Sequence, residues 1–144
     1  MISGAAGILV RLSCISLIAC AFAHGQCPVD SVIVKGRVES APRSASVRVQ
    51  LVYAKEIKGE SAEATLDGAT FNIPIEFLTQ SRKPVLLGNL RTKCDRKPAT
   101  VIVTLVEGDQ EDDRVSLDFI KDFKTDGFGV YTLRSEVTLK ARQP

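Results

Sequence analysis

The sequence predicts an all-β protein, folded as a single antiparallel β-sandwich of seven or eight strands. Short apolar runs recur along the chain with turn residues between them, and many of these runs alternate apolar with polar side chains. No segment beyond residue 30 has the periodicity of an amphipathic helix. Alternation gives each strand one face for a core and one for solvent, which is the pattern of two sheets packed face to face.

Residues 1–23 have the features of a signal peptide that is cleaved on export. Arg11 is their only charged residue, an apolar run follows it, and small residues precede a cleavage point after Ala23. In a membrane-spanning helix Arg11 would lie near the bilayer centre, where a charge is costly, so we expect removal of this segment. Residues 24–144 then form the β-sandwich domain, with cleavage after Gly25 as the alternative.

Cys20 allows a second interpretation of the leader. The run Leu-Ile-Ala-Cys that ends at Cys20 resembles the motif at which bacterial lipoproteins are acylated. A lipid on Cys20 would tether the protein to a membrane without changing its fold. Under both interpretations we expect a secreted or periplasmic protein with no integral membrane span after processing.

The mature chain retains two cysteines, Cys27 and Cys94. An even number of cysteines in an exported domain favours a disulfide between them. This disulfide would close a long loop and contribute about 4 kcal/mol in the chain-entropy model.

Charges are nearly balanced, with 19 Lys and Arg against 17 Asp and Glu, and no basic cluster stands out in the sequence. Nucleic acid and anionic membranes require a concentrated basic surface, so we do not expect them as obligatory partners.

The first strands are expected at residues 31–39 and 46–54. In the second of these the inward row is Val47, Val49, Leu51 and Tyr53. A polar segment and a short run at 62–66 follow. After the Asp67-Gly68 turn, residues 69–77 place Phe71, Ile73, Ile75 and Phe77 on one face. Pro74 cannot donate a ladder hydrogen bond, so this strand is expected at a sheet edge.

Four further strands complete the prediction. Residues 84–90 form a candidate strand, and residues 99–107 are apolar on both faces, which favours a central position. Residues 114–120 and 130–140 follow. In the last run Ser135 is the one polar residue on the inward row.

Residues 32–73 resemble the opening of the carboxypeptidase regulatory-like family of prealbumin-like (transthyretin-like) sandwiches. That family opens with a strand ending in Gly-x-Val, matched by Gly36 and Val38. A turn with Pro follows, matched by Pro42, and then a Val-x-Val-x-Leu strand, matched at 47–51. The resemblance implies an immunoglobulin-like or prealbumin-like sandwich that acts as a non-catalytic folding or binding module. It transfers no functional residues and implies no cofactor.

Catalytic and copper chemistry lack the required side chains. The only histidine, His24, lies at the cleavage site, whereas Ser-His-Asp and Cys-His mechanisms need an imidazole as base. Copper bound by His24 would need further imidazole or Met ligands, and the only Met is Met1. We therefore expect no enzyme, with a hydrolase as the least favoured function.

Two segments remain as candidate sites. The acidic segment 107–113 could hold calcium through hard oxygen ligands, although its spacing does not match an EF-hand loop and a solvated hairpin tip is the commoner explanation. The loop at 121–129 lies among four of the eight aromatic residues and could form a recognition surface, or its side chains could close one end of the core. The candidate calcium ligands are Asp109, Glu111, Asp112 and Asp113, and the candidate binding surface is Phe123, Phe128 and Tyr131.

The function we expect is an exported, non-enzymatic binding or structural module. Its partner would be a protein or glycan at the cell surface, met by the loop at 121–129. The alternative is a carrier of calcium or a small ligand, using the acidic segment or a pocket between the sheets.

Overall fold

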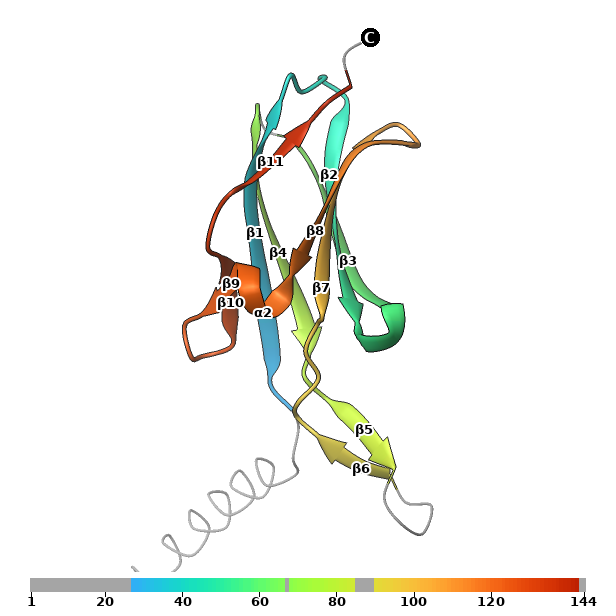
Figure 1. Cartoon of the computed structure of the whole chain (residues 1–144), viewed down its shortest axis with the longest axis vertical. Coiled ribbons are helices and arrows are strands. Elements are labelled where there is room, and N and C mark those ends of the chain that lie inside the picture. The colour runs from blue at the N-terminus through green and yellow to red at the C-terminus, as the bar shows by residue number, and fades with distance from the viewer. Residues whose placement is uncertain (1–26, 67, 85–89, 143–144) are drawn as a thin grey trace, which may run out of the picture.

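The computed structural model describes residues 27–66, 68–84 and 90–142. Within these ranges two large β-sheets pack face to face, and a two-stranded hairpin extends from one end of them (Figure 1). Eleven strands, several of them very short, account for most of the described chain. The prediction of an all-β sandwich is confirmed, but the described residues form eleven strands instead of seven or eight, because several of the expected runs divide into short strands.

The first sheet is built around β1 (Val29–Glu39). One edge of β1 pairs antiparallel with β4 (Thr70–Leu78). Its other edge pairs with β10 (Val130–Leu133) along the first half and with β11 (Val137–Lys140) along the second half, and β9 (Phe123–Thr125) lies beyond β10.

Both β10 and β11 run parallel to β1, which corrects the expectation of a wholly antiparallel sandwich. The long strand β8 (Gln110–Asp118) precedes them, and β9 runs antiparallel to β10, so the chain turns after β9 and enters β10 in the direction of β1.

The second sheet is wholly antiparallel and has the order β3-β2-β7-β8. Its inner strands are β2 (Ala45–Tyr53) and β7 (Thr100–Glu107), so the central position predicted for residues 99–107 is confirmed. The edge strand β3 (Ile57–Thr65) begins after the short turn η1 (Ala54–Glu56) and is longer than the run at 62–66 indicates. Its first half is polar because an edge strand tolerates solvent on its outer side.

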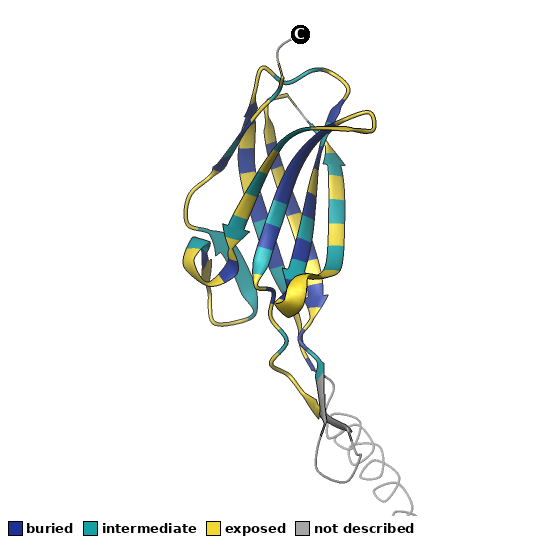
Figure 2. Ribbon diagram, turned by 45° about the vertical axis from the view of Figure 1, so that its right-hand side comes forward, coloured by how far each residue is buried: buried dark blue, intermediate teal, exposed yellow. Residues whose placement is uncertain are grey.

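Alternating side chains build the core between the two sheets (Figure 2). The inward rows predicted for β2 and β4 are all buried, and Pro74 lies in β4, which is an edge strand as predicted. Each fully buried Val or Leu stabilises the fold by about 1.5–3 kcal/mol. The largest fully buried side chains are Phe77, Leu51, Leu105, Leu139, Val32, Val34, Val47, Val49, Val101 and Val103.

The strand predicted over 84–90 is wrong. Strand β5 (Ser81–Pro84) ends where this run begins, and β6 (Leu90–Lys93) starts at its last residue. These two strands pair with each other to form the extending hairpin, and residues 85–89 lie outside the described ranges.

The single strand predicted over 130–140 is two strands, and a short helix precedes them. Helix α2 (Phe119–Asp122) has four residues, too few to produce a helical periodicity in the sequence. The segment between β10 and β11 is not paired with β1. There the backbone N–H of Arg134 donates to the carbonyl of Asp122, in α2, at 2.8 Å. Ser135 is exposed in this interruption instead of facing the core.

Candidate functional site

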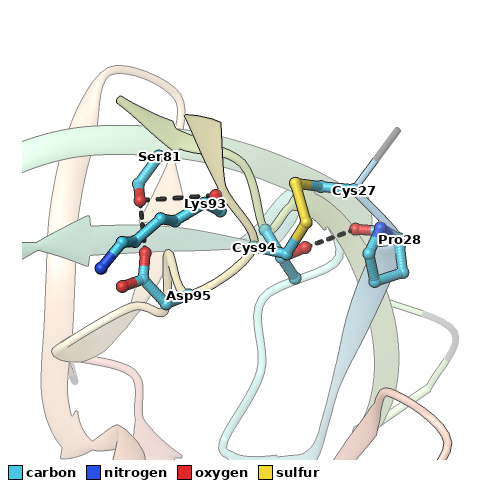
Figure 3. The surroundings of a disulfide bond; sticks show 7 residues. Cys27, Pro28, Ser81, Lys93, Cys94 and Asp95 are labelled. Atoms are coloured by element: carbon cyan, nitrogen blue, oxygen red, sulfur yellow. Dashed lines mark hydrogen bonds between the residues drawn. A yellow bond between two sulfur atoms is a disulfide. The ribbon is translucent and has the colours of Figure 1, made fainter. Parts of the chain in front are cut away.

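The predicted disulfide joins Cys27 to Cys94, with their Cα atoms 5.2 Å apart. It ties the start of β1 to the segment that follows β6. The hydroxyl of Ser81 lies between the carbonyl of Lys93, at 3.4 Å, and the carboxylate of Asp95, and hydrogen-bonds to both (Figure 3). Residues 93–95 are therefore held at the end of the sandwich.

Arg96 fixes the next part of this segment to the second sheet. Its backbone N–H donates to the carbonyl of Thr79 at 2.8 Å. Its guanidinium donates to Glu60 at 2.8 Å and lies 3.6 Å from the ring centroid of Tyr53, a cation–π contact. These contacts set the backbone position from which Lys97 projects.

Tyr53 and Glu60 complete a satisfied polar cluster around Arg96. The Tyr53 hydroxyl donates to Glu60 at 2.5 Å. Burial, then the hydrogen bond to Glu60, raises the pKa of Tyr53 above its ordinary value. Burial alone would raise the pKa of Glu60, but the hydrogen bonds from Arg96 and Tyr53 outweigh it and lower that pKa. Tyr53 is thus neutral and Glu60 charged at neutral pH, so the two side chains can hold the guanidinium of Arg96 in place.

Helix α2 follows β8 because Asp118 caps it. One carboxylate oxygen of Asp118 accepts from the backbone N–H groups of Ile120 and Lys121, each at 3.0 Å. The Asp122 carboxylate accepts from the backbone N–H of Asp118 at 2.7 Å. This turn buries Phe119 and leaves Ile120 with 83% of its surface exposed.

Four aromatic rings from four elements pack at this end of the sandwich. Phe119 lies at their centre, 4.7 Å from Tyr131 and 5.6 Å from Phe123 between ring centroids. Phe77 of β4 approaches Phe119 edge-on at 6.3 Å. Phe77, Phe119 and Phe123 are buried, whereas Tyr131 is half-buried and reaches the surface.

A pocket of about 450 Å³ opens over this cluster, between the segment 97–98, α2, β9 and β10. We call it the basic aromatic pocket. Lys97 lies over the Tyr131 ring, with its Nζ atom 5.9 Å from the centroid. The full lining is Lys97, Pro98, Phe119, Ile120, Phe123, Lys124, Thr125, Tyr131 and Arg134.

The charges of the basic aromatic pocket are all positive. Its lining includes Lys97, Lys124 and Arg134 and no carboxylate. None of these three forms an ion pair with a side chain in the described ranges. Its lining also lacks a thiol or imidazole. The arrangement therefore offers cations, hydroxyl donors and an aromatic face, which are the means of binding an anion.

The residues predicted as a recognition surface separate in the structure. Phe123 is only 3% exposed and packs in the core, which agrees with the alternative that this segment closes one end of the sandwich, and it also lines the basic aromatic pocket from below. Its inward position follows from β9, where it pairs with Leu133 of β10. Phe128 is 93% exposed at the tip of the β9–β10 turn. Tyr131 contributes to both the core and the pocket.

The predicted calcium ligands do not form a metal site. Asp109 and Glu111 are exposed near the β7–β8 turn, and the Asp113 carboxylate accepts from the backbone N–H groups of Arg114 and Lys140, each at 2.8 Å. In the described part of the chain, no group of three or more His, Cys, Asp or Glu side chains is placed to hold a metal ion. Asp112 keeps one buried carboxylate oxygen without a protein partner, and this single oxygen makes no site.

Predictions for the leader, including Cys20, His24 and cleavage after Ala23, lie outside the described residues. In the ranges that are described, no helix could cross a bilayer, which takes about 20 apolar residues.

Comparison with protein-family models, with curated proteins and with solved structures finds no match for this chain.

Sequence reasoning missed the three cations of the pocket, because they come from separate segments of the chain and no local pattern groups them. One signal was available in the segment 118–122, where Asp118 precedes a possible helical turn and Asp122 lies four positions later. A capped turn there would have placed Ile120 outward and Phe119 inward.

Proposed function

We propose that this chain is an exported, non-enzymatic binding module whose recognition site is the basic aromatic pocket. The observation that carries the proposal is a group of three cations that form no ion pair with any described side chain and lie beside an aromatic face. Unpaired cations gathered around one pocket repel each other, and an anionic ligand would relieve that repulsion. Export is supported by the leader and by the disulfide, which persists in oxidising compartments.

The sandwich type we propose is prealbumin-like, as the resemblance over 32–73 implies. In a constant-type immunoglobulin domain the first two strands share a sheet. Here β1 and β2 lie in different sheets, which favours the prealbumin-like alternative. In both types the turns and loops at the ends of the sandwich are free to carry a site while the sheets keep it rigid.

A ligand screen on the naturally processed, ¹⁵N-labelled protein tests the proposal. Anionic, neutral and cationic compounds would be added singly, and amide chemical shifts followed by NMR. We expect some compounds to shift Lys97, Ile120, Lys124 and Tyr131 together. Lys97→Gln should weaken that binding, whereas the control Lys58→Gln, an exposed lysine on β3 outside the pocket, should not. Ligands that map elsewhere, or a screen without hits, would contradict the proposal.

A further inference from the structure

We infer that the ligand of the basic aromatic pocket is a uronate, the carboxylate-bearing sugar ring of an acidic glycan. This inference rests on the proposed function and gives its ligand a chemical class. Three features of the pocket lead to it: its size and position, its set of hydrogen-bond donors, and the acidic side chains around it.

The size of the pocket suits a short stretch of a chain of rings. Its volume of about 450 Å³ lies in the lower half of the range for small-ligand sites, roughly 300–1,000 Å³. A second hollow of about 350 Å³ adjoins it and shares Lys97, Thr125 and Tyr131. Both lie at the surface, where exposed Ile120 and Phe128 flank them. A polymer could therefore enter and leave at both sides, which a closed cavity would prevent.

The donors of the pocket match a sugar acid better than an apolar ligand. Tyr131 offers its ring, whose negative face attracts the weakly positive C–H face of a sugar. Its hydroxyl has no hydrogen-bond partner among the described residues and can bond to a sugar hydroxyl. Lys97 and Lys124 can bond to a ring carboxylate, and Arg134 can do so in bidentate geometry.

Acidic side chains around the pocket limit the density of negative charge that a bound ligand can carry. Asp30 lines the adjoining hollow, and Asp122 lines a separate hollow that shares Arg134 with the basic aromatic pocket. Asp126 lies in the β9–β10 turn, where its carboxylate accepts from the backbone N–H groups of Phe128 and Val130. Phosphate and densely sulfated chains would meet these carboxylates, whereas a glycan with one charge per ring can place its charge between them. The specificity therefore favours a uronate.

Titration calorimetry with trigalacturonate, on the naturally processed protein, tests the inference. Its matched control is the fully methyl-esterified trimer, which keeps the rings and removes the charges. We expect trigalacturonate to bind, the ester to bind at least tenfold more weakly, and the affinity to fall as salt is raised. Lys97→Gln and Lys124→Gln should each weaken binding about fivefold, and Lys58→Gln should leave it unchanged.

Four results would overturn the inference: no binding of trigalacturonate, equal binding of the ester, tighter binding of a heparin hexasaccharide, or equal binding of monomeric galacturonate. The last result would assign the site to a free acid instead of a glycan. In each case the proposed function stands if another compound of the NMR screen still maps to the pocket. It fails only if no compound does, so the two failures can be told apart.

Discussion

Replacing Phe123 by alanine measures how strongly the aromatic cluster holds α2 and β9 against the sandwich. The Phe123 side chain is 3% exposed, and its ring stacks on Phe119 with centroids 5.6 Å apart. The matched substitution is Phe128→Ala, five positions away in the same chain segment, where the ring is 93% exposed. Both substitutions delete the same atoms, so the difference between them reports burial alone.

The expected cost follows from what each ring contacts. Deleting a buried Phe ring costs about 3–5 kcal/mol, through lost burial and the cavity left behind. Phe123 lies in the three-residue strand β9 at a sheet edge, where neighbours can relax, so we expect about 3 kcal/mol. For a domain of this size that corresponds to a fall in Tm of about 10 °C. Phe128→Ala should change stability by less than about 0.5 kcal/mol.

Urea unfolding of the three proteins, followed by circular dichroism, gives the free energies directly. The midpoint for Phe123→Ala should fall while the slope m stays constant, which indicates a change in stability without a change in the unfolded state. Equal effects of the two substitutions, or a larger effect of Phe128→Ala, would refute the packing argument and return Phe123 to the surface.

Three further predictions concern the framework of the site. Replacing Cys27 and Cys94 together by alanine should lower the free energy of unfolding by about 4 kcal/mol, measured in urea. Without the disulfide the unfolded chain gains conformational entropy, and an unchanged urea midpoint would contradict this. The lowered pKa of Glu60 stabilises the fold above its ordinary pKa of 4.5, and this stabilisation is lost as the pH falls through the folded-state pKa. Glu60→Gln should therefore lower the free energy of unfolding by about 1 kcal/mol at pH 7, and Tm should then fall less steeply as the pH is lowered. The same dependence of Tm on pH in the variant and the wild type would refute this prediction. Gly129→Ala should cost about 2 kcal/mol or more in thermal unfolding, since Gly129 has φ +88° and a Cβ there would meet the Asp30 carboxylate. An unaffected Tm would exclude this strain.

The long strands could be predicted from the sequence because each one buries a single face. Phe71, Ile73, Ile75 and Phe77 alternate strictly with polar residues, and β4 has one buried side along its whole length. A single strand over 84–90 was expected from apolar composition without such alternation, but Pro84 and Leu90 pair with each other across two strands. Apolar composition alone does not indicate a strand, because it says nothing about which face is covered.

The candidate site was only partly accessible from the sequence, for a different reason. Phe119, Phe123 and Tyr131 were recognised as a concentration of aromatics, but their directions depend on α2, which is too short for a periodic signal. Lys97 enters the site from another part of the chain, through a segment held by the disulfide and Arg96. No local pattern encodes that approach, since it depends on tertiary contacts.

The location of the pocket follows from the way in which the chain changes sheets. β8 ends the second sheet, and β10 must start beside the beginning of β1 in the first sheet. The chain between them crosses the open end of the sandwich, and it covers the core there with Phe119 and Phe123 while its other side chains face solvent. The disulfide brings the segment 94–98 to the same end. The crossing between sheets thus forms a pocket with aromatic rings at its base and cations around its opening. Substitutions of exposed residues in this crossing segment would change which ligand binds without disturbing the sheets.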